Sequence, residues 1–346
     1  MILLKSKKLI FLLLVFIFGL FILSGCGRTG SPEGELVVYN ARNETFVKPL
    51  LDRFEKETGI QVRILSGREE LVNQIIEEQN NVRADVFISN DAGAMDFLRR
   101  EGLLAVNGSA LLESIGGQFR APDGSWVGLS ARSRVLIYNK DLISEEEMPQ
   151  TLQELADPAW AGRFMITRGG NSSMVTHVAA LRLVWGDDAT REWLSAVKDN
   201  AGAIVGGHTD IRQAVGAGEF EFGLVNNYYY HLQLEETTGS NVGAVYPDQG
   251  PDDMGVFVNV AGLALINGAP NEENARRFID WMLEEEQQAE FSYYSKETPL
   301  NSEVRTVEEA RRIDQYKVMD LDLADLGPLW NDARALIEES GLDLGI

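Results

Sequence analysis

Short apolar runs alternate with stretches of helical periodicity along the first third of the chain. Three segments have the length and apolar character of strands: 36–39 (LVVY), 61–65 (QVRIL) and 84–88 (ADVFI). Residues 46–54 and 69–79 lie between them and carry apolar side chains three and four positions apart, which predicts amphipathic helices. This alternation predicts a parallel α/β sheet. Ligands bind such sheets beyond the carboxyl ends of the strands, here residues 39–43 and 89–91.

The same alternation continues to the C-terminus without an internal repeat. Residues 127–138 form a long apolar segment that only Arg132 and Arg134 interrupt. Three further segments are expected to be strands: 201–205, 221–225 and 256–265. Apolar spacing predicts helices over 174–185, 210–217, 272–294, 307–312 and 329–341. The chain of 346 residues therefore has material for about two α/β domains.

Composition narrows the classes of function. Hydrophobic residues make up 45% and aromatic residues 9%, which excludes disordered, collagen-like and coiled-coil chains. Lys and Arg number 31 against 53 Asp and Glu, for a formal net charge of -22. A surface this acidic repels phosphate backbones, so nucleic acid is not expected as a partner. The single cysteine excludes an intramolecular disulfide.

The N-terminus has the organisation of an export signal. Three lysines within residues 5–8 precede an apolar stretch, 9–23, that is shorter than the roughly 20 residues of a membrane span. The segment LSGC, which ends at Cys26, resembles the lipobox of bacterial lipoproteins. This implies a signal peptide over 1–25 and a lipid on Cys26, followed by a polar tether over 26–34. The alternative is an ordinary signal peptide that contains a cysteine. We expect an exported protein, anchored to the cell membrane on its outer face or in the periplasm.

Several strings within residues 35–346 resemble the ferric-ion-binding branch of the periplasmic solute-binding proteins. They are LVVYN from Leu36, FEKETG from Phe54, ADVF from Ala84, GLSARSRV from Gly128, LADPAWAG from Leu155, QAVGAG from Gln213 and GLVNNYY from Gly223. Strings such as FEKETG recur across solute-binding proteins, whereas Leu-Val-Asn-x-Tyr-Tyr is more specific to iron binders. The resemblance implies a monomer that captures ferric iron and delivers it to the permease and ATPase of an ABC transporter.

The resemblance also implies an α/β fold of type II, with two lobes, each a mixed sheet flanked by helices, and a ligand cleft between them. We place the two crossing strands near residues 132–138 and 256–261. Lobe 1 would comprise residues 35–134 and 260–346, and lobe 2 residues 135–259. Closure of the lobes on the ligand is a hinge motion.

Two adjacent tyrosines carry the metal prediction. Ferric iron prefers anionic oxygen donors and displaces the phenol proton, although the free pKa of tyrosine is about 10. Tyr228 and Tyr229 follow the predicted strand at 221–225 and match the paired iron-binding tyrosines of the family. Adjacent side chains at a strand end point in opposite directions, so two adjacent ligands require irregular backbone there. Taken alone, the tyrosines could instead form an aromatic core cluster or a carbohydrate-stacking platform.

Other ligand positions of the family differ in this chain. Asn43 stands where many relatives have a histidine, and Ser89-Asn90 where a carboxylate often follows, with Asp91 one step later. The loop 167–174 (TRGGNSSM) lacks a tyrosine, and His208 replaces an anion-binding asparagine. The protein ligands could thus be two tyrosines alone, with about four octahedral positions left to an anion or water. Alternatively, His208 or Asp91 supplies a donor, and Asn43 and Asn90 bind or support the metal.

A synergistic anion, such as carbonate, citrate or phosphate, is the expected companion of the metal. Arg132 could hold it in bidentate fashion, or could form a salt bridge between the lobes. Arg134 shares the face of Arg132 only if the strand is regular. Asn226 matches an anion-contacting residue of the family. Ser172 and Ser173 precede a predicted helix, whose first backbone amides form either an anion site or a capped turn.

Two other functions stay open from the residues. The fold could bind a small anion or an organic acid through its arginines, without metal. An extracellular hydrolase would need a nucleophile, a base and an orienting group, yet no Gly-x-Ser-x-Gly or HExxH pattern occurs. We therefore expect no enzyme. Of the remaining histidines, His177 is expected to pack inside a helix, and His231 to lie at the surface or to support the site.

Overall fold

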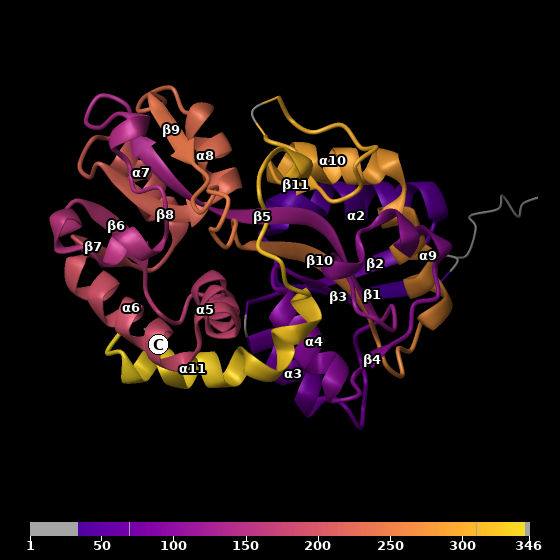
Figure 1. The fold of residues 1–346 in the computed structure, drawn as a ribbon. Coiled ribbons are helices and arrows are strands. Elements are labelled where there is room, and N and C mark those ends of the chain that lie inside the picture. Colours follow the sequence, from indigo (N-terminus) through magenta and orange to yellow (C-terminus); the bar gives the residue numbers. More distant parts are fainter. Residues whose placement is uncertain (1–33, 69, 309, 343–346) are drawn as a thin grey trace, which may run out of the picture.

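A computed structural model describes residues 34–68, 70–308 and 310–342. Two lobes lie side by side and are bridged by two long strands, β5 (Trp126–Asn139) and β10 (Val258–Ile266), as Figure 1 shows. The predicted export signal, Cys26 and the tether up to residue 33 lie outside the described residues. Among the helices within these ranges, none has the length and apolarity needed to cross a membrane.

The first lobe is built on a mixed sheet, with three parallel strands at one edge and antiparallel pairing at β10 and β5, so the parallel sheet predicted from the alternation is found only at that edge. Its strands are β1 (Glu35–Asn40), β2 (Gln61–Ser66), β3 (Val86–Ser89), β4 (Leu104–Ala105) and β11 (Thr298–Pro299). The order is β2-β1-β3-β10-β5, with β10 antiparallel to β3. The helices are α2 (Glu44–Thr58), α3 (Glu70–Glu77), α4 (Ala92–Arg100), α9 (Glu272–Leu283) and α10 (Glu285–Ser295). Helix α2 buries Val47, Leu50, Leu51 and Phe54, the apolar stripe of the sequence pattern.

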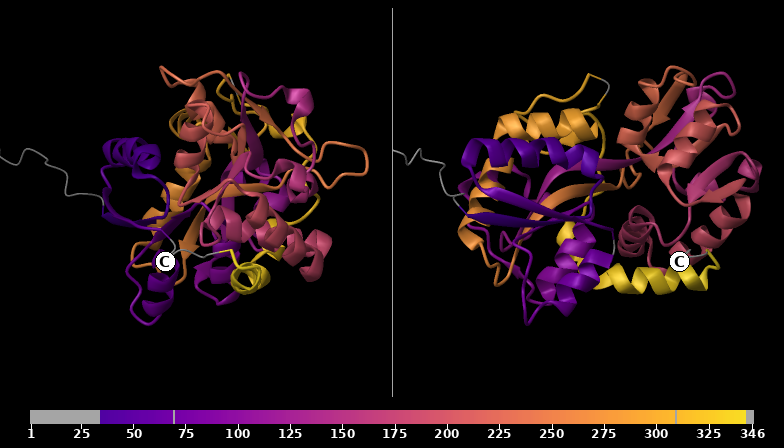
Figure 2. Two further views of the ribbon diagram at one scale, coloured as in Figure 1. Left: turned by 90° about the vertical axis from the view of Figure 1, so that its left-hand side faces the viewer. Right: turned by 180° about the vertical axis from the view of Figure 1, so that it is seen from behind.

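The second lobe extends the same sheet through the far half of β5. Its strands are β6 (Phe164–Thr167), β7 (Ala203–Val205), β8 (Phe222–Asn226) and β9 (Val242–Val245). Its helices are α5 (Ser172–Trp185), α6 (Asp187–Asn200), α7 (His208–Gly216) and α8 (Asn227–Leu234). Helix α11 (Trp330–Glu339) packs chiefly on α5 and α6, which Figures 1 and 2 also show. The expectation that all of 260–346 belongs to the first lobe therefore does not hold for α11.

The remaining helical turns are short 3-10 segments on the connections. They are Ala110–Ser114, Gly117–Phe119, Glu145–Glu147, Gln153–Ala156, Pro158–Trp160, Ile313–Gln315, Leu323–Asp325 and Gly327–Leu329. Two helix predictions were wrong in this part of the chain. The described residues of 307–312 form no helix. The helix expected over 272–294 is divided at Glu284, whose backbone is extended (φ -67°, ψ 149°).

The strands β5 and β10, which bridge the lobes, pack with their backbones close together. Strand β5 pairs with β10 through Ser133 and with β8 from Arg134 onward, so one strand serves both lobes. The register of β5 and β10 shifts between Ala261 and Gly262. A Cβ atom on Gly262 would meet the carbonyl oxygen of Val127 closer than real Cβ contacts occur. Only glycine therefore fits at this irregularity.

We expect Gly262→Ala to destabilise the protein by about 1–3 kcal/mol, because the strand must shift to admit a methyl group. A thermal melt should show a midpoint several degrees lower, at about 2–4 °C per kcal/mol. Gly117→Ala is the matched control, because a Cβ at Gly117 has no heavy atom within 4 Å. Equal melting temperatures for the two variants would contradict this account of the bridge.

Candidate metal and anion site

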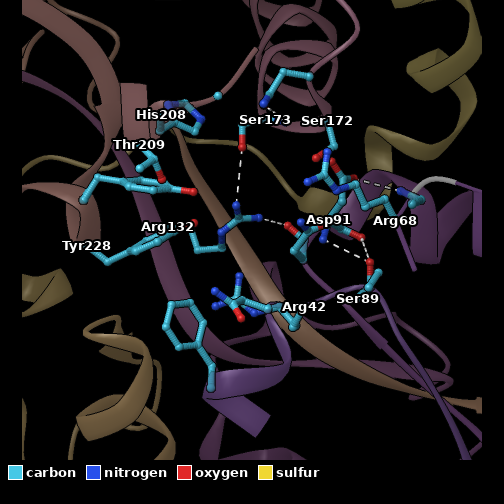
Figure 3. Close-up of a pocket in the computed structure, with 18 of the residues that line it drawn as sticks. Arg42, Arg68, Ser89, Asp91, Arg132, Ser172, Ser173, His208, Thr209 and Tyr228 are labelled. Carbon is cyan, nitrogen blue, oxygen red and sulfur yellow. Dashed lines mark hydrogen bonds between the residues drawn. The ribbon is translucent and has the colours of Figure 1, made fainter. Parts of the chain in front are cut away.

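A cavity of about 850 Å³ lies between the lobes. The first lobe lines it with the segments that follow β1 and β3, and the second lobe with the N-terminal ends of α5, α7 and α8. These first-lobe segments are the carboxyl ends at 39–43 and 89–91 that the strand pattern singled out. Figure 3 shows Arg42, Ser89 and Asp91 of these segments in one view with Tyr228, His208 and Ser173 of the second lobe.

The two tyrosines lie in the first turn of α8. Successive helical residues are rotated by about 100°, which brings both rings to one cavity without the irregular strand end that we expected. The ring centroids of Tyr228 and Tyr229 are 4.3 Å apart, with an interplanar angle of 32°. Burial, and then the neighbouring Tyr228, raise the pKa of Tyr229 well above its ordinary value. Its deprotonation at neutral pH therefore needs a strong positive charge, such as a trivalent metal ion.

Two buried arginines flank Tyr228. The guanidinium carbons of Arg42 and Arg132 lie 5.8 and 5.7 Å from the centre of its ring. Glu297 is fully buried and accepts hydrogen bonds from Arg42 Nη2 at 2.7 Å and from Ser130 Oγ at 2.5 Å. It also forms an ion pair with Arg132 Nε at 3.3 Å. Neither Arg42 nor Glu297 was predicted from the sequence, although Arg42 lies in the segment after the first strand where a ligand was expected.

The predicted anion-binding residues converge at the start of α5. Arg132 Nη2 lies 3.4 Å from Ser173 Oγ, and Asn226 Nδ2 donates to the same oxygen at 3.1 Å. Asn171 caps the helix by accepting from the backbone N–H of Ser173 at 3.1 Å, and Ser172 lines the same cavity. The helix begins at Ser172 rather than at residue 174. This places a guanidinium, an amide and a helix N-terminus around one point, which is a favourable arrangement for an anion.

Burial would by itself lower the pKa of Arg132, but the nearby Tyr228 and Glu297 outweigh that effect and raise it. Arg132 therefore stays charged. Arg134 is 1% exposed and does not line the cavity. Its Nη1 lies 3.3 Å from Asn226 Oδ1 and 3.4 Å from His208 Nε2. Burial and the charge of Arg132 lower the pKa of Arg134 to about 9. Arg134 thus contacts Asn226 and His208, which line or border the site, but does not itself face the cavity.

The four other candidate ligands all line the cavity and all make structural contacts, His208 through its Nε2 atom 3.4 Å from Arg134 Nη1. Asn43 caps α2 by accepting from the Thr45 N–H at 3.1 Å, and the Asn90 backbone oxygen accepts from Arg132. Asp91 caps α4 and also accepts from Thr176, and burial raises its pKa. The His208 ring lies 4.9 Å from that of Tyr229, and among the described residues its Nδ1 has no hydrogen-bond partner. His208 is therefore the better placed of the four to supply a further donor.

The remaining histidines lie away from the cavity. His177 is buried within α5 and stacks on Phe257 with ring centroids 5.3 Å apart, as packing predicts. His231 is 2% exposed and its Nδ1 lies 2.8 Å from the Lys296 backbone oxygen, so the surface position expected for it was wrong. Within the described ranges, no cluster of three or more His, Cys, Asp or Glu side chains could hold a metal ion. Among the described residues, Tyr228 and Tyr229 are the tyrosines that line the cavity.

Residues 50–316 match the model of the bacterial extracellular solute-binding protein family. Iron uptake protein A1 of Synechocystis is 31% identical over 337 residues, which cover 92% of this chain and 93% of that protein. The Fe(3+)-binding periplasmic protein of Serratia marcescens is 33% identical over 258 residues, or 74% of this chain and 75% of the relative.

Solved structures show the same architecture. Iron-bound HitA from Pseudomonas aeruginosa has a TM-score of 0.83 and 30% identity, and the match covers 89% of this chain and 99% of that one. The Trichodesmium protein in complex with iron and citrate has a TM-score of 0.80 and 28% identity, over 90% of this chain and all of the other. These likenesses confirm the two-lobed type II fold and the family resemblance predicted from the sequence. The chain belongs to the bacterial extracellular solute-binding protein family.

Proposed function

We propose that this protein captures ferric iron outside the cytoplasm for an ABC importer. The observation that carries the proposal is the pair of cavity-lining tyrosines, whose ring centroids are 4.3 Å apart at the start of α8. Relatives described as ferric-iron-binding proteins, at 30% identity or more over most of this chain, support it. The family consists of binding proteins, which agrees with the expectation that this chain is not an enzyme.

In this proposal, Tyr228 and Tyr229 bind iron as phenolates, and an anion occupies the position between Arg132, Asn226, Ser172 and Ser173. The converging contacts on Ser173 Oγ support the anion position. His208 is the candidate for an additional donor because its ring borders Tyr229. A small anion such as carbonate, or a chelating one such as citrate, would complete the coordination of the hard Fe³⁺ ion.

Delivery completes the proposal. A lipid on Cys26 and the tether after it would hold the monomeric protein at the membrane, near the permease and its ATPase. The lobes would close on iron by bending near residues 134–135 and 259–260. The change of pairing partner along β5 at Arg134 supports a hinge there.

A second candidate function is binding of an anion or organic acid without metal. The observation in its favour is the set of arginines around the cavity, Arg42 and Arg132 among them. It predicts a colourless protein whose ligand binding does not require Tyr228 or Tyr229.

A visible absorption titration separates the two functions. We expect a saturable phenolate-to-iron band when ferric citrate, or ferric iron with bicarbonate, is added to the purified protein. Omitting every chelating anion should weaken the band, because the two tyrosines leave most coordination positions open. A protein that stays colourless, and that iron does not stabilise in a thermal melt, would contradict iron binding and favour the metal-free anion.

A further inference from the structure

The cavity has a charge opposite to that of the whole molecule. The chain has a formal net charge of -22, yet five arginines line the cavity: Arg42, Arg68, Arg132, Arg168 and Arg212. The only carboxylates that line it within the described ranges are Asp91 and Asp210. Asp91 is 2% exposed and is occupied by its capping contacts. A concave, positive site in an acidic protein concentrates negatively charged ligands.

Three of these arginines already have carboxylate partners. Arg42 and Arg132 share Glu297, and Arg212 pairs with Glu236 at 2.8 Å. Arg68 and Arg168 differ, because among the described residues neither lies within the 4.0 Å ion-pair distance of a carboxylate. The Nε atom of Arg168 is buried, and it has no hydrogen-bond partner among the residues that the structure describes. Within the described ranges, the guanidinium groups of Arg68 and Arg168 therefore border the cavity without a carboxylate partner.

These two arginines come from opposite lobes. Arg68 follows β2 in the first lobe, and Arg168 follows β6 in the second. Figure 3 places Arg68 across the cavity from Tyr228, beyond Asp91. Arg168 lines the same cavity from the second lobe, so an anionic ligand that fills the cavity would border guanidinium groups of both lobes. Bidentate contacts to carboxylates are the interactions that arginine makes best.

Charge balance points to the kind of anion. Fe³⁺ and two phenolates leave one positive charge, and Arg42 and Arg132 with Glu297 leave another. Arg68 and Arg168 add two more, and the carboxylate of Asp210, which also lines the cavity, offsets one of them. Carbonate is too small and carries too little charge to neutralise both regions. A multiply charged chelate supplies the missing oxygen donors and places its outer carboxylates near Arg68 and Arg168.

We infer that the cargo is ferric iron already bound by a polycarboxylate of the hydroxy-acid type, and that Arg68 and Arg168 form a second subsite for its outer carboxylates. This inference rests on the proposed iron-binding function and deepens it. The chelate contacts both lobes, so it favours the closed state, and the two arginines give selectivity for chelated over simple iron.

The test compares two iron sources on the Arg68→Gln/Arg168→Gln double variant. Affinities are measured from the phenolate-to-iron band with ferric citrate and with ferric iron plus bicarbonate. We expect the affinity for ferric citrate to fall at least tenfold more than the affinity for iron with bicarbonate, because two charge-assisted contacts are lost. The matched control is Arg63→Gln/Arg191→Gln, which removes two positive charges from exposed pairs with Glu35 and Asp188. This control should change neither affinity.

The possible outcomes distinguish failure of the chelate subsite from failure of the proposed iron-binding function. Equal losses for both iron sources, or no loss with ferric citrate, would overturn the chelate subsite while iron binding stands. An equal loss of selectivity in the control would show that general charge, and not this subsite, attracts the chelate, and would also overturn the inference. A wild-type protein without the band in either medium would overturn the proposed function itself.

Discussion

Tyr228→Phe and Tyr229→Phe are each expected to lower iron affinity more than 100-fold and to abolish or strongly weaken the visible band. Each substitution removes one of the two phenol oxygens that line the cavity and that we propose bind the metal as phenolates. Loss of a residue that only supports a metal ligand typically costs 10–100-fold, so loss of a ligand itself should cost more. Binding should be followed by the absorption titration with ferric citrate.

The fold should survive both substitutions. Phenylalanine keeps the ring packing, including the contact between the two rings, whose centroids are 4.3 Å apart. Tyr293→Phe is the matched control, because that side chain is 62% exposed on α10, away from the cavity. A normal melting temperature with no band is the expected pattern for the two site variants. Normal iron affinity in both would show that the tyrosines are not the ligands.

The α/β organisation was predictable because its signals are local. The strands β1 and β3 and the helix between β1 and β2 follow from apolar runs and from 3.6-residue spacing, and the structure has them within a few residues of the predicted bounds. The break at Glu284 was not predictable in the same way. Residues 272–294 have helical spacing throughout, and only the packing of α9 and α10 determines where the axis turns.

The same distinction holds for the site. The strings around Tyr228 and Ser173 were informative because β8–α8 and the start of α5 are each continuous segments of chain. Periodicity could not show that α8 begins at Asn227, since the aromatic run carries no clear amphipathic pattern. Glu297 had no local signal at all. Its partner Arg42 is 255 positions away in the sequence, and only the fold brings them together.

Glu297→Ala is expected to produce the largest loss of stability. Removing this carboxylate leaves the side chains of Arg42 and Arg132, which are 2% and 3% exposed, without a counter-ion in the interior. Breaking a buried ion pair from one side typically costs about 3–5 kcal/mol, a large part of the 5–15 kcal/mol that stabilises a typical protein. A thermal melt should show a midpoint lower by roughly 10 °C.

Two further variants show whether the loss of stability in Glu297→Ala arises because the ion pairs of Glu297 are buried. Glu286→Ala removes a carboxylate that is 73% exposed and pairs with Arg53 at 2.8 Å, so its effect should stay within about 1 kcal/mol. Glu297→Gln should fall between the two, because the amide oxygen can still accept from Arg42. If Glu297→Ala melted like Glu286→Ala, the two arginines would not depend on Glu297 for their charge balance. A multiply charged anion added to Glu297→Ala should restore part of the lost stability, because it supplies negative charge beside the same two guanidinium groups.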